Sequence, residues 1–430
     1  MRPRDATVGG RPARWLVDAT ALRPATLTPP PSKSDAQRAL ALAHAIGDPS
    51  SVELGADDDE ALPDDVNVLR RGLDVLRTEP QRDLLVDCHD GGAPFRILVG
   101  QAAVTPGARV RFTGSARLAE RPHQPLFQSL RAALAPAGLV LDEGAPWPLV
   151  VQGAGRASDP HFVISASDSS QFATSLLMAA AAQVVRERRA WTVDLRGPTA
   201  SRGYLDLTLE WLARMGFLTS TEGDRIRLSD RRAVSTTPQV PGDWSSLGYL
   251  LLAAWKTGGD VARVDVKAAH PDRAFVRIVE AAGLALEEMP GGGVALKGQL
   301  CAGVRASGSE CPDLLPTLAA LACVAPAPST FTEVSILRHK ESDRLEGICE
   351  LVRAAGGTVV LDEDALTLTP GRVPEHFVLS SRGDHRLAMS AATLAVLSAA
   401  TLELEGPACV TKSFPTFWRE MARVGVRVVG

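Results

Sequence analysis

Six Ala-rich segments that are apolar on every side recur along the chain about every seventy residues. They are ALALAHAIG, FRILVGQAAV, FATSLLMAAAAQ, LGYLLLAAWK, LLPTLAALACVA and LAMSAATLAVLSAA. A helix without a polar face must lie inside a domain. The segments between them are amphipathic, with apolar residues at the three- and four-residue spacing of one helix face. This alternation predicts six similar units, each with a buried helix and a covering helix.

Five of the amphipathic segments end at a glycine, which can adopt the left-handed conformation that caps a helix. These glycines are Gly138, Gly216, Gly283, Gly356 and Gly425. An earlier segment, with apolar residues from Val66 to Leu76, has the helical spacing but not the glycine. Hairpin signals such as LTSTEGDRIRLS and TVVLDEDALTLTP follow most of these segments and predict strands between the helices. Six α/β units of this size fit two domains of three units.

A polar cluster precedes each of the six buried helices. The clusters are Ser32–Arg38, Asp90–Gly92, Ser169–Gln171, Asp243–Ser246, Pro312–Asp313 and Gly383–Arg386. Helix capping is the better interpretation for Asp243 and Ser245. It does not explain Lys33, Arg38 or Arg386, because a cation near the positive end of a helix is unfavourable. Cations added to helix N-termini form sites for phosphate and carboxylate groups, so we expect an interdomain cleft that binds small polyanions.

If the substrates are anions, the positive charge that binds them must be concentrated at the binding site. The net charge is −4, too close to neutral for a general nucleic-acid-binding protein. The 46 basic residues comprise 40 Arg and only 6 Lys. Because this chain uses Arg almost everywhere, each remaining Lys indicates a position that needs a compact ammonium group or a movable proton. Three of the lysines, Lys33, Lys340 and Lys412, lie in polar motifs.

The sequence also indicates where the protein works. Its six cysteines form no CxxC pair, which is typical of free thiols in a reducing compartment. The N-terminal stretch lacks the apolar run of a signal peptide, and the longest apolar runs are too short to span a membrane. The eight histidines show no HxH or HxxxH pair, and no GxxxxGK[ST] motif occurs. We therefore expect a cytoplasmic protein without metal, cofactor, nucleic-acid or membrane partners.

The segment Arg338–Arg344, RHKESDR, opens the fifth amphipathic helix. A solvated, charged helix start would explain it. It also places Lys340 beside Glu341 and near Arg344, and a proton donor held near cations suits chemistry on an anion. The segment alone leaves both interpretations open.

Taken together, the motifs resemble those of the 5-enolpyruvylshikimate-3-phosphate synthases. SKS followed by Arg38, SSQ, KESDR, DHR and KSFP occur here in that family's order, from Ser32 to Pro415. The resemblance implies two inside-out α/β domains, each of three βαβαββ units, with the active site in the cleft between them. The first domain would span 32–241, and the second 1–31 and 242–430.

The resemblance also implies an activity. A member of this family transfers the enolpyruvyl group of phosphoenolpyruvate to the 5-hydroxyl of shikimate 3-phosphate by addition and elimination, releasing phosphate. The reaction belongs to chorismate and aromatic amino-acid biosynthesis, and it needs no cofactor. We expect a monomer that binds these two small molecules. Gly92 would leave room for glyphosate, an inhibitor that competes with phosphoenolpyruvate.

Roles are implied for the residues at matching positions. Expected contacts of shikimate 3-phosphate are Lys33, Ser34, Arg38, Ser169, Ser170, Gln171, Ser201, Tyr204, Asp313 and Lys340. Expected contacts of phosphoenolpyruvate are Lys33, Gly92, Arg121, Gln171, Arg344, Arg386 and Lys412. Asp313 would take the proton of the 5-hydroxyl, and Glu341 would act on the methylene carbon of phosphoenolpyruvate. Lys33 is the third expected catalytic residue, although which lysine shares the proton transfer stays open.

The sequence departs from the family pattern in places. Ala93 follows Gly92 where the family has Thr, Ile336 replaces an Asn, and SRGY at Ser201–Tyr204 replaces SKPY. One alternative is UDP-N-acetylglucosamine enolpyruvyl transferase, but that family uses a loop Cys, and the region GSARLAERPHQPLF has none. The other alternative is a catalytically silent anion-binding paralogue. Retention of the ionisable residues argues against it, and Ile336 keeps it open.

Overall fold

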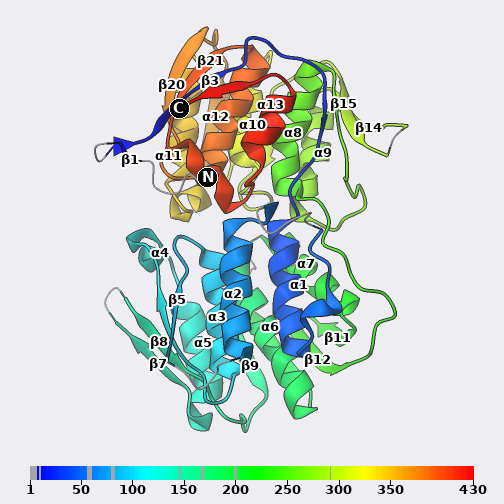
Figure 1. Cartoon of the computed structure of the whole chain (residues 1–430), viewed down its shortest axis with the longest axis vertical. Helices are drawn as coiled ribbons and strands as arrows, with labels where there is room; N and C mark the ends of the chain where they lie inside the picture. The colour runs from blue at the N-terminus through cyan, green and yellow to red at the C-terminus, as the bar shows by residue number, and fades with distance from the viewer. Residues whose placement is uncertain are drawn as a thin grey trace. The chain divides into compact units, whose positions relative to one another are not determined.

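The computed structural model describes residues 7–8, 11–55, 61–78, 83–144, 147–165, 169–197, 201–290 and 292–430 (Figure 1). The chain forms two compact units. Unit 1 comprises Met1–Ser32, Ala56–Asp64 and Pro241–Gly430, and unit 2 comprises Lys33–Gly55 and Asp65–Val240. Each unit is a mixed α/β structure with small four-stranded sheets.

Unit 2 contains two sheets with one topology. The first has the order β5-β6-β8-β7 and the second the order β9-β10-β12-β11, with the first two strands parallel and the others antiparallel. The strands are β5 (Asp83–Asp87), β6 (Arg109–Thr113), β7 (Val140–Glu143), β8 (Leu149–Gln152), β9 (His161–Ser165), β10 (Trp191–Arg196), β11 (Phe217–Glu222) and β12 (Arg225–Arg231). In each case one buried and one covering helix separate the first three strands, with additional short helices in the first case, which gives the predicted βαβαββ unit.

Unit 1 repeats this topology three times, as β4-β13-β15-β14, β16-β17-β19-β18 and β20-β21-β3-β22. The strands are β3 (Arg14–Asp18), β4 (Thr26–Leu27), β13 (Asp260–Val261), β14 (Leu284–Glu288), β15 (Val294–Gly298), β16 (Arg305–Ser307), β17 (Ser329–Thr332), β18 (Thr358–Asp362), β19 (Ala365–Thr369), β20 (His376–Ser380), β21 (Thr401–Glu405) and β22 (Arg427–Val429). In the last sheet the third position, between β21 and β22, is filled by β3 from the other end of the chain, which lies antiparallel to both neighbours. A separate two-stranded ribbon joins β1 (Thr7–Val8) and β2 (Arg11–Pro12).

The first unit of the repeat differs from the other five. Within the described residues it supplies two helices, α1 (Lys33–Ile46) and α2 (Asp64–Thr78), and a single parallel bridge between Glu53 and Gln239. The segments 56–60 and 79–82, which flank α2, lie outside the described residues. The six-fold repeat thus consists, in the described residues, of six helix pairs and five complete sheets.

The six apolar segments are helices, as predicted. Unit 2 holds α1, α3 (Gly92–Val104) and α6 (Ser170–Glu187), and unit 1 holds α8 (Trp244–Thr257), α10 (Leu315–Ala322) and α12 (His385–Ser398). All eight residues of α10 are buried, as are all residues of α12 except Ser398. Figure 1 shows α1, α3 and α6 alongside one another inside unit 2. Burial of a Leu or Phe stabilises a fold by roughly 1.5–3 kcal/mol, so these helices form the core of each unit.

The covering helices are α2, α5 (Gln124–Leu134), α7 (Arg202–Arg214), α9 (Ala274–Ala281), α11 (Arg344–Ala354) and α13 (Phe417–Arg423). The five predicted capping glycines have φ angles between 76° and 102°, so the left-handed conformation is confirmed. The shorter helices are α4 (Ala116–Glu120) and the 3-10 helices η1 (Pro49–Ser51), η3 (Ala135–Ala137), η4 (Pro271–Arg273), η5 (Val334–His339) and η6 (Pro407–Lys412).

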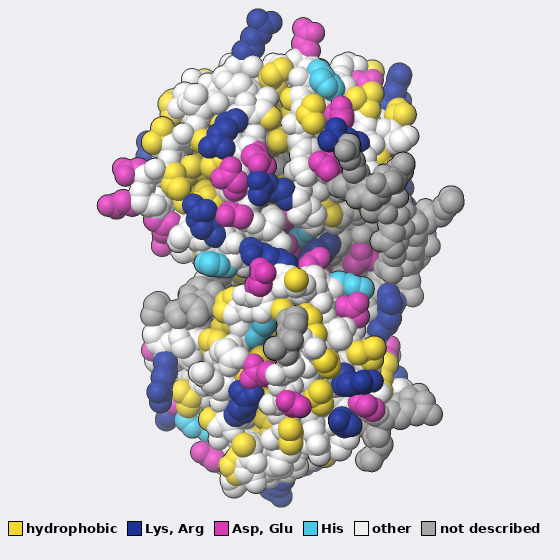
Figure 2. All heavy atoms as spheres, turned by 90° about the vertical axis from the view of Figure 1, so that its left-hand side faces the viewer, with side chains coloured by type: hydrophobic (Ala, Val, Ile, Leu, Met, Phe, Trp, Pro, Cys, Tyr) yellow, Lys and Arg dark blue, Asp and Glu magenta, His cyan; other side chains and the backbone are white. Residues whose placement is uncertain are grey.

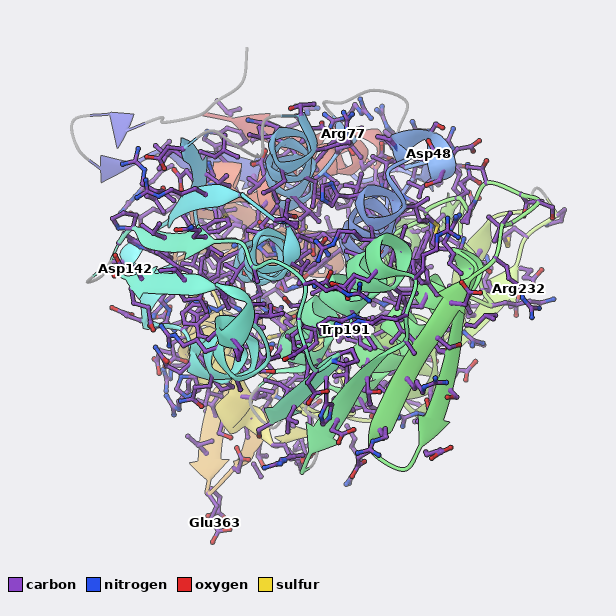
Figure 3. All side chains as sticks on the ribbon, turned by 90° about the horizontal axis from the view of Figure 1, so that it is seen from below. Asp48, Arg77, Asp142, Trp191, Arg232 and Glu363 are labelled. Carbon is purple, nitrogen blue, oxygen red and sulfur yellow. The ribbon has the colours of Figure 1, made fainter. Side chains whose placement is uncertain are left out.

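Both quoted hairpin signals are also confirmed. LTSTEGDRIRLS forms β11 and β12, and TVVLDEDALTLTP forms β18 and β19. Glu363, with φ of 51°, lies at the tip of the second hairpin and projects from the body of its unit (Figure 3). Trp191, on β10, is fully buried, and its ring centroid lies 4.9 Å from that of Phe162 on β9 (Figure 3). One face of each sheet therefore packs on the helices of its unit.

The surface is mixed in charge. On the face in Figure 2, the Lys and Arg side chains are interspersed with those of Asp and Glu. Among the residues that the structure describes, no helix is both long enough and apolar enough to cross a membrane.

Candidate active site

A buried arginine at the start of α11 is the centre of a charged network in unit 1. The Arg344 side chain is 1% exposed. Its Nε donates to Asp384 (2.7 Å), its Nη1 to Asp313 (2.8 Å) and its Nη2 to Glu341 (2.5 Å). Burial alone would lower the pKa of Arg344, but these three carboxylates raise it above its ordinary value. One permanently charged guanidinium thus positions three carboxylates.

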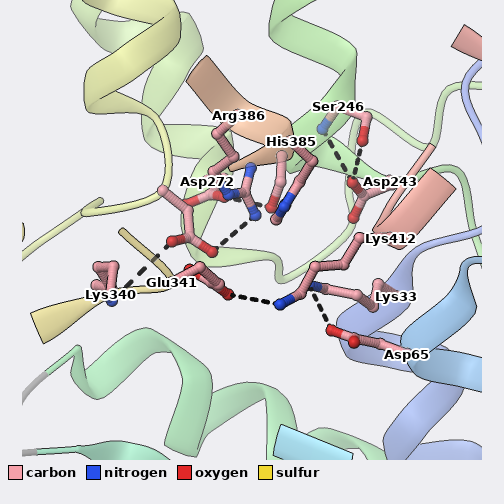
Figure 4. A network of polar contacts seen from close by, with 12 residues as sticks. Lys33, Asp65, Asp243, Ser246, Asp272, Lys340, Glu341, His385, Arg386 and Lys412 are labelled. Carbon is pink, nitrogen blue, oxygen red and sulfur yellow. Dashed lines mark hydrogen bonds and ion pairs between the residues drawn. The ribbon is translucent and has the colours of Figure 1, made fainter. Parts of the chain in front are cut away.

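Asp313, just before α10, contacts two further cations. Its Oδ2 accepts a hydrogen bond of 2.7 Å from Arg386 Nη2, and its Oδ1 lies 4.0 Å from Lys340 Nζ (Figure 4). Burial would raise the pKa of the Asp313 carboxyl, but the charges of Arg386, Arg344 and Lys340 outweigh it and hold the pKa well below its usual range. Asp313 is therefore ionised at neutral pH and is surrounded by groups that can bind anions.

Glu341 links the network to the C-terminal region. Its Oε1 lies 3.7 Å from the Nζ of Lys412, which ends η6 (Figure 4). Its Oε2 accepts from Arg344. The Glu341 and Lys412 side chains are each 14% exposed, so both are mostly buried and still accessible. The structure thus brings together all six of the site residues predicted within unit 1. They are Asp313, Lys340, Glu341, Arg344, Arg386 and Lys412.

Asp384 is a member of this network that the motif analysis did not assign to the site. It is fully buried and caps α12, where its Oδ1 accepts from the backbone N–H of Arg386 (2.9 Å). Its Oδ2 accepts from Arg344 and from Ser342 Oγ (3.2 Å). One carboxylate thus orients both arginines. Its position two residues before Arg386, at a helix N-terminus, was the signal that could have identified it.

Helix capping was predicted for two residues of the fourth polar cluster. Asp243 does cap α8, since its Oδ2 accepts from the backbone N–H of Ser246 (2.9 Å) (Figure 4). The capping interpretation is wrong for Ser245, which lies inside α8 and donates its hydroxyl to Asp272 (2.5 Å). Asp272 is fully buried, and burial raises the pKa of its carboxyl. No sequence motif marked this aspartate, because its partners lie on other elements.

In unit 2, the first residue of α1 meets α2 and the glycine-rich turn. Lys33 Nζ lies 3.1 Å from Asp65 Oδ2, and the two side chains are 14% and 9% exposed (Figure 4). A Cβ at Gly91 would lie 3.0 Å from Asp65 Oδ1, so the turn before α3 passes close to the same carboxylate. Asp65 was not predicted, since its 32-residue separation from Lys33 carries no periodic signal.

Arg38 joins α1 to α7 in the interior of unit 2. Its side chain donates to Thr208 Oγ1 (2.9 Å), to the Ser34 carbonyl (2.7 Å) and to the Tyr204 carbonyl (2.9 Å). Burial lowers the pKa of this guanidinium to about 10, so it still carries its charge at neutral pH. These contacts hold Ser34 and Tyr204 in place, while direct binding of a substrate phosphate by Arg38 stays a prediction.

Gly92 and Arg121 are in direct contact. Gly92 is the first residue of α3, and a Cβ there would lie 2.5 Å from Arg121 Nη1. Arg121 follows α4, and its Nε and Nη1 are buried without a hydrogen-bond partner in the part of the chain that is described. A half-buried guanidinium with two buried nitrogens that lack acceptors, close to the N-terminus of a helix, is suited to an anionic ligand.

The remaining predicted residues lie at the starts of α6 and α7. Ser169 caps α6, with its Oγ accepting from the backbone N–H of Gln171 (3.3 Å), and the Gln171 Oε1 accepts from Arg96 on α3 (2.5 Å). Ser170 is the first residue of α6, and Ser201, with φ of 53°, directly precedes α7. The N-terminal ends of α1, α3, α6 and α7 are thus connected by contacts of Arg38, Arg96 and Arg121.

Ile336, which replaces a family Asn, lies in η5 and packs against the apolar core of unit 1. Its Cγ2 would lie 3.3 Å from a Cβ built at Gly308. The side chain therefore contributes apolar contacts at this position and offers no hydrogen-bonding group.

Comparisons with known proteins identify the family to which the sequence belongs. The sequence profile described as EPSP synthase (3-phosphoshikimate 1-carboxyvinyltransferase) matches residues 20–421. The chain is 33% identical to a 3-phosphoshikimate 1-carboxyvinyltransferase of Methanopyrus kandleri over 421 residues, covering 94% of this chain and 96% of that one. It is 35% identical to the enzyme of the same name from Methanoculleus marisnigri over 351 residues, covering 80% of each chain.

The fold agrees as well. The structure of EPSP synthase from Acinetobacter baumannii superposes with a TM-score of 0.72 at 19% identity, covering 97% of this chain and 100% of that one. The profile spans nearly the whole chain, and the relatives above 30% identity share one name. The chain belongs to the EPSP synthase (3-phosphoshikimate 1-carboxyvinyltransferase) family of transferases.

Proposed function

We propose that this protein transfers the enolpyruvyl group of phosphoenolpyruvate to the 5-hydroxyl of shikimate 3-phosphate and releases phosphate, in chorismate and aromatic amino-acid biosynthesis. The observation that carries the proposal is the network in which Arg344 holds both Asp313 and Glu341. Addition of a hydroxyl to an enol carbon needs a base on oxygen and an acid on carbon. The network supplies two carboxylates for these roles among four cations.

The charge of the substrates explains the number of cations. Two phosphates at about −1.5 to −2 each, with two carboxylates, carry roughly −5 to −6 in total. The cations of the unit 1 network are partly offset by Asp313, Glu341 and Asp384. Lys33 and Arg121 of unit 2 supply further positive charge. We therefore propose that the two units are separate domains that act on the same pair of substrates, with residues from both forming the active site.

Asp313 is the base in this proposal, and substrate binding makes it a stronger one. The charges of Arg386, Arg344 and Lys340 hold its pKa low. When the carboxylate and phosphate of phosphoenolpyruvate bind these cations, the anionic charge offsets theirs and the pKa of Asp313 rises. Asp313 then accepts the proton of the 5-hydroxyl as its oxygen bonds to C2 of phosphoenolpyruvate.

Glu341 supplies the proton for the other carbon. As the C2–C3 double bond breaks, C3 becomes a methyl group by taking a proton from Glu341, which lies 3.7 Å from the Nζ of Lys412. Elimination then reverses these transfers: C3 loses a proton, the double bond re-forms, and the C2–O bond to phosphate breaks. Arg344 and Arg386 stabilise the charge of the departing phosphate.

Two other functions are disfavoured. The names of the relatives favour shikimate 3-phosphate over UDP-N-acetylglucosamine as the acceptor. The intact set of contacts among Asp313, Glu341 and the surrounding cations argues against a catalytically silent paralogue.

An assay of phosphate release tests the proposed reaction. The purified protein should release phosphate from phosphoenolpyruvate when shikimate 3-phosphate is present, without added metal. UDP-N-acetylglucosamine serves as the control acceptor and should give no release. Turnover with the control acceptor alone, or an absolute requirement for metal, would contradict the proposal.

Variants of one lysine from each unit test whether both units take part. Lys33→Met in unit 2 and Lys412→Met in unit 1 should each lower kcat/KM for phosphoenolpyruvate by roughly ten- to a hundredfold. This is the range for losing a hydrogen bond to a charged group, about 1.5–3 kcal/mol. Lys267→Met, at an exposed position, is the matched control and should leave kcat/KM unchanged. Normal kcat/KM in Lys33→Met would exclude Lys33 from the reaction as proposed.

We further propose that the protein is a cytoplasmic monomer with small molecules as its only partners. Its cysteines are free, which suits a reducing compartment. The interspersed surface charges in Figure 2 are unlike the basic stripe of a nucleic-acid-binding protein.

A further inference from the structure

Arg96 is a buried arginine of α3 that none of the roles above includes. Its side chain ranks among the largest that are fully buried, at 1% exposure. Its Nη1 donates to Gln171 Oε1 (2.5 Å) and its Nη2 to the Pro122 carbonyl (2.8 Å). Its guanidinium carbon lies 5.0 Å from the ring centroid of Phe172. One planar group therefore contacts two oxygens and an aromatic ring on two other parts of unit 2.

The contact with Gln171 determines which way that side chain is oriented. A guanidinium has only donors, so the carboxamide must turn its oxygen toward Arg96. The amide nitrogen, with two N–H donors, then points to the opposite side. Gln171 lies in the first turn of α6, where the backbone N–H groups also favour an anion. An amide held in this orientation offers donors, and no acceptor, to the carboxylate or phosphate of a substrate.

The contact with Pro122 acts on a second expected ligand. Pro122 directly follows Arg121, whose Nη1 would lie 2.5 Å from a Cβ at Gly92. By fixing the Pro122 carbonyl, Arg96 limits the movement of the segment that carries Arg121. The Ser175 hydroxyl in turn donates to the Arg96 carbonyl (2.6 Å), so the α3 backbone at this point is itself held by α6.

We infer that Arg96 is a positioning residue of the active site, which fixes the Gln171 carboxamide with its amino group toward the substrates and holds the Arg121 segment in place. The inference rests on the proposed function, because it assumes that Gln171 and Arg121 bind substrate anions. Arg96 itself touches neither substrate. A lysine could not replace it, since a single ammonium lacks the planar fork that reaches two oxygens.

The chain offers a matched control at the far end of the same helix pair. Arg186 of α6 donates to the Val104 carbonyl at the end of α3 and to the Gln183 side-chain oxygen. It joins α6 to the end of α3 through the Val104 carbonyl, and its second contact is a carboxamide of its own helix. Like Arg96, it therefore binds one carbonyl and one carboxamide. None of the expected substrate contacts lies at this end of the helices.

The first experiment measures KM and kcat for both substrates, together with Tm, in Arg96→Lys, Arg186→Met, Gln171→Ala and the double variant Arg96→Lys/Gln171→Ala. Arg96→Lys should raise the KM for phosphoenolpyruvate about ten- to a hundredfold. Arg186→Met should lower Tm but leave both KM values within about twofold of the wild type. The KM for phosphoenolpyruvate of the double variant should be little higher than that of the poorer single variant. Once Arg96 is replaced, the Gln171 amide is misoriented and no longer binds substrate, so removing it has little further effect.

The outcomes separate a positioning role from a structural one. Additive effects of Arg96→Lys and Gln171→Ala, or an equal rise in KM in Arg186→Met, would overturn the inference. Wild-type turnover with both substrates tests the proposed function separately. If the wild type is active and the effects of the two substitutions are additive, the role inferred for Arg96 is wrong while the proposed function stands.

A second variant keeps the inference testable if Arg96→Lys does not fold. Gln171→Glu preserves an oxygen for Arg96 but has no amide nitrogen to offer the substrates. Its Tm should match or exceed that of the wild type, while its KM for phosphoenolpyruvate should rise at least as much as in Gln171→Ala. A wild-type KM in Gln171→Glu would show that the amide donor is not used, and would overturn the inference.

Discussion

Replacing Asp313 with Asn should lower kcat by about a hundredfold or more, the usual scale for losing a positioned acid or base. Asn keeps the shape of the side chain but cannot accept the proton of the 5-hydroxyl. The KM for phosphoenolpyruvate should change far less, because the cations Arg344 and Arg386 stay in the site and one nearby negative charge is removed. Steady-state rates with both substrates at several pH values measure the effect.

Glu341→Gln should give a loss of similar size for the opposite reason, since Gln has no proton to donate to carbon. Glu310→Gln is the control for both variants, because Glu310 is an exposed partner of Arg277 and should not affect turnover. Near-normal turnover in either active-site variant would disprove the role proposed for that carboxylate.

Replacing Arg344 with Met should abolish turnover and destabilise the fold. Three carboxylates would lose the cation that they share, and breaking a buried ion pair costs about 3–5 kcal/mol. In the wild type the pKa of Asp313 is depressed, so its contribution to stability is present above the unfolded pKa and disappears as the pH falls through the folded pKa. The variant should therefore be much less stable than the wild type at neutral pH, and the difference should shrink toward acidic pH.

Urea unfolding at neutral pH and at a pH below about 4, the unfolded pKa of an aspartate, measures this difference. Arg277→Met is the matched control, since it breaks an ion pair with Glu310 whose arginine side chain is 65% exposed. Exposed pairs contribute about 0–1 kcal/mol, so this control should unfold near the wild-type midpoint. Equal midpoints for Arg344→Met and the control would contradict the account of the buried network.

The fold could be predicted largely because its units are encoded locally. An apolar segment such as LLPTLAALACVA specifies a buried helix by composition alone, and a glycine such as Gly216 specifies a helix end by its backbone freedom. What periodicity cannot encode is the partner of each strand. The pairing of β3 with β21, from opposite ends of the chain, has no local signal, and neither does the single bridge that Glu53 makes in the first unit.

The same limit applies to the site. Residues that bind through one motif were predicted, as with Glu341 and Arg344, three positions apart. Residues that position them were missed when the contact joins distant elements, as with Asp65 and Lys33 or Arg96 and Gln171, which are 32 and 75 positions apart. Such partners are brought together by tertiary packing, and a single sequence indicates tertiary packing only where a known motif is present.

The strand that completes the last sheet of unit 1 has a consequence for how the protein is made. Arg14 on β3 pairs with Glu403 on β21, 389 positions later. At roughly 5–20 residues per second, a ribosome needs about 20–80 s to synthesise the chain between them. During that time unit 2, whose last residue is Val240, can already fold, while β3 has no strand to pair with. An unpaired strand edge invites contact with other chains, so for this protein the risk of aggregation is greatest during translation, before β21 and β22 emerge.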